Sequence, residues 1–392
     1  MYEPEVDRRA LIGVATQFFV NGAAFASFVP RLPEIRDMIG IDTRDVGVAL
    51  FIAGLVGLVG SAVTSRLITM LGTRRVVMIG GVLLSLSLLV VGNANGYVAL
   101  VVGLALFSTL DVFVDVAMNL QGSWISGRRK HPVMNRLHGL WSLGTLVGGF
   151  TASWMANVGV SLRLHSLIVA SVLVAAVMLV SRWLLAVDEA VFHEIVDSSK
   201  TTIRRPLLLV GLGLAGLFAV VLESTSNDWA SFRMTDDFGL SAGAGALGYV
   251  AVAVGMTASR FAGDWMVAMI GEIRHLALSL AITFVGLLLA TLVSSTGVAF
   301  VGFALTGVGI ASLLPTIYDR AAKYPGPTGA GLGALTAGIR VALLAAPLAI
   351  GSLATSSLTV GAAMAIFALP SVLGFAAVAL ALGRQGDSRT LL

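Results

Sequence analysis

An apolar stretch of the chain, residues 96–125, carries acidic and amide side chains at a regular spacing. Asp111, Asp115 and Asn119 follow one another at intervals of four residues, so in a helix all three lie on one face. A charged side chain in a bilayer is costly, and it therefore usually faces protein or water. We interpret Asp111 and Asp115 as proton-coupling residues and prefer Asp111, which lies nearer the centre of the stretch. The alternative is that each carboxylate only ties neighbouring helices together.

The composition is that of a protein embedded in a membrane. The chain has 392 residues, of which 57% are hydrophobic and 12% charged, whereas soluble proteins have about 25% charged residues. The 45 glycines suit close helix packing in lipid. Because the basic residues lie in short loops between apolar segments, we expect the lipid bilayer, and no nucleic acid, as the partner.

The chain lacks the sequence motifs of several classes of enzymes and metal sites. The chain has no cysteine, which excludes disulfides, thiolate catalysis and cysteine metal sites. It contains neither a GxxxxGK[ST] run nor an HExxH motif. We therefore predict no enzyme activity, no metal and no cofactor.

Twelve apolar segments predict an all-α membrane protein with twelve transmembrane helices. A charged linker, 187–205, separates a bundle of six helices at 1–186 from a second bundle of six at 206–392. The segments are approximately 10–30, 45–70, 75–93, 97–125, 134–157, 163–186, 206–229, 243–269, 275–295, 297–320, 329–354 and 358–383.

The distribution of basic residues predicts the orientation. With an even number of spans both termini lie on one side, and most Arg and Lys residues fall on that side. The other side has only Arg31, Arg36, Arg44, Arg163 and Arg233. By the positive-inside rule both termini are cytoplasmic. The polar N-terminus is not typical of a cleaved signal peptide, so we expect a multi-pass protein of the cytoplasmic membrane whose first span is its own insertion signal.

The two halves of the chain repeat weakly. An offset of about 200 residues places Asn21 opposite Glu223, Arg31 opposite Arg233 and Gly72 near Gly271, as expected for two halves related by an axis along the membrane normal.

Five stretches carry a resemblance to a known family. FFVNGAAFASFVPRLPEI (18–35), MNRLHGLWSLGTLVGG (134–149), ESTSNDW (223–229), VGMTASRFAGD (254–264) and GVGIASLLP (307–315) are similar to the MosC-like and YbjJ-like permeases. That subgroup of the major facilitator superfamily is distantly related to fucose permease. The resemblance implies two pseudo-symmetric six-helix bundles, a sugar-like cargo and proton coupling through an acid on the fourth span.

The same resemblance implies which polar residues line a central cavity. In this family the first, fourth, seventh and tenth spans line it, which makes Gln17, Asn21, Asn119 and Asn227 substrate-binding candidates. Glu223 on the seventh span is a third proton-coupling candidate, or the partner of a base.

Two larger side chains are further candidates for substrate binding. Trp141 either stacks on a sugar ring or only packs. Arg340 lies at the centre of the eleventh span, where it needs a partner. That partner is Glu223, a fourth-span acid, or a carboxylate of the substrate. Pro315 and Pro347 are expected to interrupt the tenth and eleventh spans, either as hinges or as tolerated kinks.

Two loops resemble the cytoplasmic latch of the superfamily. Gly72, Arg74 and Arg75 follow the second span. In the second half the corresponding stretch contains Asp264, and Arg260 lies one turn before it. We expect Arg260 and Asp264 to form a local ion pair.

These observations predict a secondary active transporter. It is expected to act as a monomer and to move a small polar solute, such as a sugar or polyol derivative, by alternating access coupled to protons. A first alternative is a proton-linked exporter of amphipathic compounds. A second is a membrane receptor that transports nothing.

Overall fold

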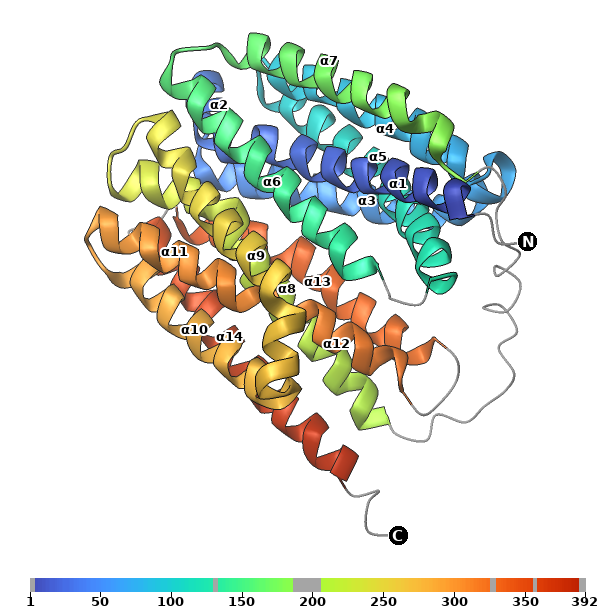
Figure 1. Ribbon diagram of the computed structural model, residues 1–392. Helices are drawn as coiled ribbons and strands as arrows, with labels where there is room; N and C mark the ends of the chain where they lie inside the picture. The colour runs from blue at the N-terminus through green and yellow to red at the C-terminus, as the bar shows by residue number, and fades with distance from the viewer. Residues whose placement is uncertain (1–3, 130–132, 186–205, 325–328, 355–357, 388–392) are drawn as a thin grey trace.

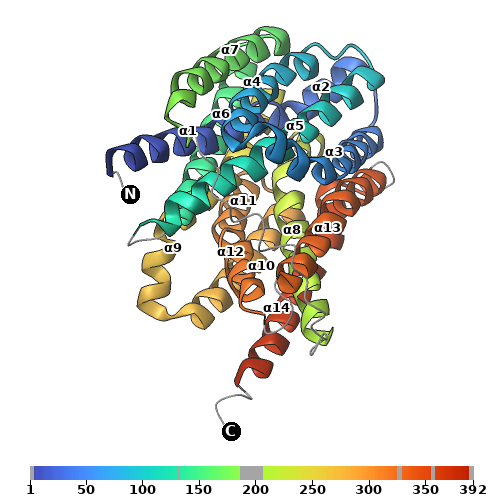
Figure 2. The same ribbon diagram turned by 90° about the vertical axis from the view of Figure 1, so that its right-hand side faces the viewer.

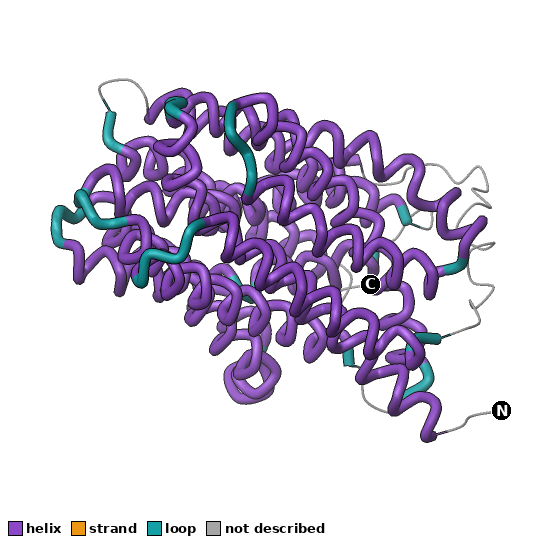
Figure 3. The backbone as a smooth tube through the Cα atoms, turned by 90° about the horizontal axis from the view of Figure 1, so that it is seen from above, coloured by secondary structure: helices purple, strands orange, loops and turns teal. Residues whose placement is uncertain are grey.

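The structure is a computed structural model that describes residues 4–129, 133–185, 206–324, 329–354 and 358–387. All regular secondary structure in these ranges is helical. Figure 3 shows the helices running alongside one another between two ends, where the loops gather. The predicted linker 187–205 lies outside the described residues.

Among the described residues, the first half of the chain forms six long helical segments. They are α1 (Pro4–Phe28) with its continuation through η1 (Val29–Arg31) into α2 (Leu32–Ile39), α3 (Thr43–Leu71), α4 (Thr73–Gly92), α5 (Tyr97–Gly127), α6 (Met134–Asn157), and α7 (Leu162–Val180) with the turn η2 (Ser181–Trp183).

The described part of the second half forms six corresponding segments. They are α8 (Pro206–Phe232) with the π-helical turn η4 (Arg233–Asp237), α9 (Ala242–Ile270), α10 (Glu272–Leu292), α11 (Thr296–Ile310) followed by α12 (Leu313–Ala322), α13 (Ala330–Ala354), and α14 (Val360–Asp387). The predicted twelve-helix fold is confirmed.

Length and hydropathy identify most of these segments as membrane spans. Within the described ranges, eleven helical stretches are long and apolar enough to cross a membrane. The remaining segment, α6, has 24 residues and is more polar, because it carries Asn135, Arg136, His138 and Ser142. It packs between α1 and α9, where neighbouring helices cover part of its surface.

The break in the tenth span follows from a proline. Pro315 has no N–H to donate, and its ring crowds the carbonyl four residues earlier, at Ala311. The helix ends at Ile310 and resumes at Leu313. Pro347, by contrast, lies within the unbroken helix α13, so the predicted interruption of the eleventh span is wrong. A membrane helix tolerates such a proline where neighbouring helices satisfy the freed backbone groups.

The helix contacts repeat between the halves. The pairs α1–α6, α3–α5, α4–α5 and α4–α7 of the first half correspond to α8–α13, α9–α11, α10–α11 and α10–α14 of the second. Two main interfaces join the halves, α6 against α9 and α3 against α13, and Figure 2 shows α3 and α13 side by side.

Each half contains a buried arginine at equivalent places, which the sequence repeat had aligned. Arg31 is 1% exposed and donates to both carboxylate oxygens of Glu34 at 2.6 and 2.7 Å. It also donates to the carbonyl of Val160 at 3.0 Å and lies 3.0 Å from Nδ1 of His165. These contacts tie the end of the first span to the start of the sixth.

In the second half, Arg233 pairs with Asp237 and donates to the carbonyl of Val293 at 3.1 Å. Asp237 in turn accepts from the backbone N–H groups of Val360 and Gly361, at 3.1 and 2.8 Å. The end of the seventh span is thereby tied to the start of the twelfth.

The halves are joined tightly at one end of the bundle. We call the end that carries both termini the terminal end, and the other the distal end. At the distal end Arg36 of α2 binds Asp236 of η4 through two contacts of 2.5 and 2.9 Å. Ser153 of α6 donates to the carbonyl of Gly243 in α9 at 2.7 Å. The two sets of helices converge there and diverge toward the terminal end (Figure 1).

Close helix packing in the second half depends on Gly255 of α9. A Cβ placed there would collide with the carbonyl of Ala304 and lie 2.8 Å from the backbone nitrogen of Val308. We expect Gly255→Ala to destabilise the fold by about 1–3 kcal/mol, as overpacking does. Gly263→Ala on the same helix meets open space, so it should raise the stability slightly. Melting temperatures of the two purified variants check this, and equal values would contradict it.

Candidate functional site

Asp111 is the first member of a chain of polar contacts at the centre of the molecule. Its Oδ1 accepts a 2.7 Å hydrogen bond from the side-chain amide of Asn21 on α1. The Oδ1 of Asn21 accepts from Nε1 of Trp141 on α6 at 2.8 Å. The amide of Asn21 therefore connects α5 with α6.

Arg260 continues this chain into the second half. Its guanidinium carbon lies 5.6 Å from the ring centroid of Trp141, a cation–π distance, and its Nη1 donates to the hydroxyl of Ser142. Its Nη2 lies 3.8 Å from Oε1 of Glu223 on α8. We call Asp111, Asn21, Trp141, Arg260 and Glu223 the central polar chain. It joins carboxylates of both halves across their interface.

The predicted pairing of Arg260 with Asp264 is wrong. Arg260 faces the interface between the halves and contacts Glu223 and Ser142 instead. Asp264 accepts a 2.9 Å hydrogen bond from Asn135 of α6. Two side chains four residues apart on a helix differ in direction by about 40°. This difference is enough to give Arg260 and Asp264 different neighbours. Asp264 thus joins the two halves near the terminal end.

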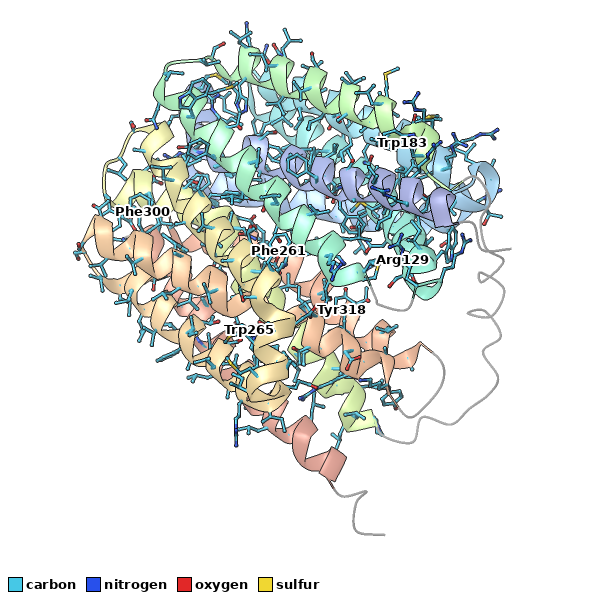
Figure 4. All side chains as sticks on the ribbon, in the orientation of Figure 1. Arg129, Trp183, Phe261, Trp265, Phe300 and Tyr318 are labelled. Atoms are coloured by element: carbon cyan, nitrogen blue, oxygen red, sulfur yellow. The ribbon has the colours of Figure 1, made fainter. Side chains whose placement is uncertain are left out.

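Asp115 and Asn119 lie on α5 beyond Asp111, toward the terminal end. The amide of Asn119 donates to Oδ1 of Asp115 at 2.9 Å, and Asp115 remains exposed. Tyr318 of α12 lies within electrostatic reach of both Asp115 and Glu223. Its side chain is 43% exposed and lies where the two halves diverge (Figure 4). Tyr318 was not among the residues predicted from the sequence, because it follows a helix break whose direction no local pattern specifies.

Gln17 does not line the space between the halves. It is 1% exposed, lies beside Gly81 of α4, and its Nε2 is buried without a hydrogen-bond partner. The structure therefore contradicts its predicted place in the cavity. The α1 helix is covered by α4 as well as by α5 and α6, so a polar residue one turn from Asn21 faces a different neighbour.

The seventh span adds polar groups next to Glu223. Asn227 follows it by one turn, is 8% exposed, and makes no side-chain hydrogen bond with the described residues. Asp228 accepts from the hydroxyl of Ser224 and lies within electrostatic reach of Glu223. The stretch 223–228 therefore presents several polar side chains close to the end of the central polar chain.

Arg340 is half-buried on α13 and forms no salt bridge with any described residue. The expected pairing with Glu223 or with an acid of the fourth span is wrong.

The predicted latch glycines have the geometry of sharp turns. Gly72 and Gly271 end α3 and α9 with φ of 79° and 83°, a backbone conformation that favours glycine. Nε of Arg74 donates to the carbonyl of Ser181 at 3.3 Å, which ties α4 to the end of the sixth span, whereas Arg75 is exposed. These contacts stay within the first half.

The sequence comparison decides the family. Residues 14–226, more than half of the chain, match the model of the Major Facilitator Superfamily. The chain belongs to the Major Facilitator Superfamily. It is therefore a multi-pass membrane protein and a secondary transporter, and not an enzyme.

Individual relatives of this superfamily member agree with that assignment. The chain is 26% identical to an uncharacterized MFS-type transporter of Yersinia pestis over 348 residues, 88% of each chain. It is 25% identical to the membrane protein MosC of Rhizobium meliloti over 320 residues, 80% of this chain and 75% of MosC. The resemblance to MosC-like permeases is thereby confirmed.

A solved structure shows the same fold. The crystal structure of the nucleoside transporter NupG superposes with a TM-score of 0.67 at 12% identity, covering 97% of this chain and 98% of that one.

Proposed function

We propose that this transporter moves a small polar solute together with protons, and that its site is the central polar chain. One observation carries the proposal: hydrogen bonds connect Asp111 through Asn21 to Trp141, and the ring of Trp141 lies against Arg260, which faces Glu223. A change in the charge of Asp111 alters a contact with α1, and α1 is joined through α6 to the other half. Protonation in the first half is thereby linked to the interface about which the halves rotate.

We further infer that the terminal end faces the cytoplasm, as the positive-inside rule predicts. The structure then represents an inward-facing state, closed at the distal end by Arg36 and Asp236 and open toward the cytoplasm beside Asp115 and Tyr318. Alternating access requires that the distal contacts separate while the terminal ends approach one another.

The experiment is solute-driven proton movement in proteoliposomes, measured with a trapped pH indicator over a panel of sugars, polyols, their acids and amphipathic cations. We expect Asp111→Asn to lower the flux about 100-fold or more, the scale of effect for losing a proton-transferring group. Asp319→Asn is the matched control, since Asp319 is an exposed acid that pairs with Lys323 at 2.5 Å. If Asp111→Asn retains the flux of the unmodified protein, Asp111 serves only to hold neighbouring helices together.

Exposed aromatic side chains favour export of amphipathic compounds as a second candidate. Phe261 is 56% and Tyr318 is 43% exposed, and both lie where the halves meet and diverge (Figure 4). In the same assay this function gives proton flux of the opposite sense, driven by the amphipathic cations and by none of the polyols.

A further inference from the structure

The guanidinium of Arg260 has unused hydrogen-bond donors. Of its five N–H groups, Nη1 serves Ser142. Its Nη2 lies 3.8 Å from Glu223, beyond the 2.7–3.2 Å of a hydrogen bond. Its Nε is buried without a partner. The Nε–Nη2 edge, which in arginine pairs side-on with a carboxylate, therefore makes no hydrogen bond to the part of the chain that the structure describes.

Glu223 faces this edge but does not fill it. Its carboxylate is 19% and the Arg260 side chain 14% exposed, so both charges are largely removed from water. Unfilled donors on a buried charged group are unfavourable, and a bidentate ligand relieves that cost. The loose pair is thus suited to exchange one carboxylate for another.

The neighbouring acids restrict the charge of such a ligand. Each is held by a neutral donor: Asp111 by Asn21, Asp115 by Asn119 and Asp228 by Ser224. None of them competes for Arg260 in the structure. Glu223 faces Arg260, and Asp228 lies within electrostatic reach of Glu223. These two acids oppose a second negative charge, which disfavours phosphate and dicarboxylates.

We propose that the Nε–Nη2 edge of Arg260 binds the single carboxylate of a hydroxylated monocarboxylate solute, in exchange with Glu223. This inference rests on the proposed transport function and names its substrate class. Asn227, which has no side-chain hydrogen bond within the described residues, supplies a neutral donor and acceptor for the hydroxyl groups. Trp141 supplies an apolar face beside the carboxylate.

The exchange also connects solute binding to protons. When a solute carboxylate pairs with Arg260, Glu223 loses its cationic partner. Protonation of Glu223 then removes the resulting unpaired negative charge. Other titratable groups face this pair from every side: Asp228 on α8, Tyr249 on α9, Tyr318 on α12, and His138 on α6. The proton dependence is therefore assigned by variants of Glu223 itself.

The test uses ligands that differ in one terminal group, and with it in charge. D-gluconate, D-glucitol and D-glucamine share a six-carbon hydroxylated chain that ends in a carboxylate, an alcohol and an ammonium group. Glycerate, glycerol and 3-amino-1,2-propanediol repeat the series with three carbons. Binding to the purified full-length protein is measured as the rise in melting temperature with ligand concentration, and transport as proton flux in proteoliposomes.

We expect the carboxylate of at least one series to bind and move protons, and its neutral and cationic counterparts to do neither. Arg260→Gln should weaken carboxylate binding about 10- to 100-fold, as expected for a charged hydrogen-bonded pair, and Arg260→Lys less. Glu223→Gln should retain carboxylate binding but lose its dependence on pH. Arg320→Gln is the matched control, because Arg320 pairs with Glu272 at 3.1 Å away from the site.

The outcomes separate this inference from the proposed function. Flux with an alcohol or an amine that survives Arg260→Gln overturns the carboxylate site and leaves transport in place. The carboxylate site is also overturned if neither gluconate nor glycerate raises the melting temperature. Absence of solute-driven proton flux with every compound overturns the proposed function. The preference among the three charges is measured on the unmodified protein, so it stands even if an Arg260 variant does not fold.

Discussion

Glu34→Gln is expected to lower the melting temperature of the purified protein strongly, because it leaves a buried arginine without its counter-charge. Arg31 is 1% exposed, and both oxygens of Glu34 neutralise it at 2.6 and 2.7 Å. Removing one partner of a buried ion pair costs about 3–5 kcal/mol. We expect the lower part of that range, since Val160 and His165 remain as neutral neighbours.

The control for this prediction lies on the same helix. Asp37 also accepts from an arginine, Arg36, at 2.8 Å, but it is 66% exposed. Asp37→Asn should therefore change the stability by at most about 1 kcal/mol, as exposed pairs do. Arg31→Met should cost less than Glu34→Gln, because the released Glu34 is 28% exposed and can be hydrated. Equal melting temperatures for Glu34→Gln and Asp37→Asn would show that burial does not govern this pair.

The second large effect concerns the distal closure. Arg36 and Asp236 belong to different halves, meet through two contacts of 2.5 and 2.9 Å, and are 12% and 22% exposed. The guanidinium of Arg36 also lies 5.3 Å from the ring centroid of Phe232. Under the proposed rocking mechanism this pair exists only in the state with a closed distal end. The free energy of the ion pair therefore stabilises that state relative to the state with an open distal end.

We expect Asp236→Asn to increase the population with an open distal end about tenfold, which corresponds to about 1.4 kcal/mol. Because the chain has no cysteine, spin labels can be placed uniquely at Val158→Cys and Leu358→Cys, two exposed distal positions of different halves. Pulsed electron-spin measurements should show a longer distance component in Asp236→Asn.

Two further variants test the assignment of that distance change. The exchange Arg36→Asp with Asp236→Arg should restore most of the short component, because the pair is re-formed with reversed charges. Asp37→Asn, which leaves the bond between the halves intact, should not alter the distribution. A distribution in Asp236→Asn that matches the unmodified protein would show that the ion pair does not hold the distal end closed.

The sequence alone determined the elements of this protein. A span must supply about 20 apolar residues, and this requirement marked the helices correctly. The spacing of four residues placed Asp111 and Asp115 on one face of α5, since helical periodicity is local. The internal repeat aligned Arg31 with Arg233, and both are buried arginines that pair with an acid a turn later.

The partners of the polar side chains were decided only by the tertiary structure. Arg260 contacts Glu223 and Ser142 rather than Asp264, Gln17 faces α4, and Arg340 pairs with none of the expected acids among the described residues. Each outcome depends on how a helix is rotated and on which surface of the other half it meets. Those quantities result from packing between residues far apart in the chain, such as Arg36 and Asp236. A periodic pattern states which residues share a face, and the assembled bundle determines what that face contacts.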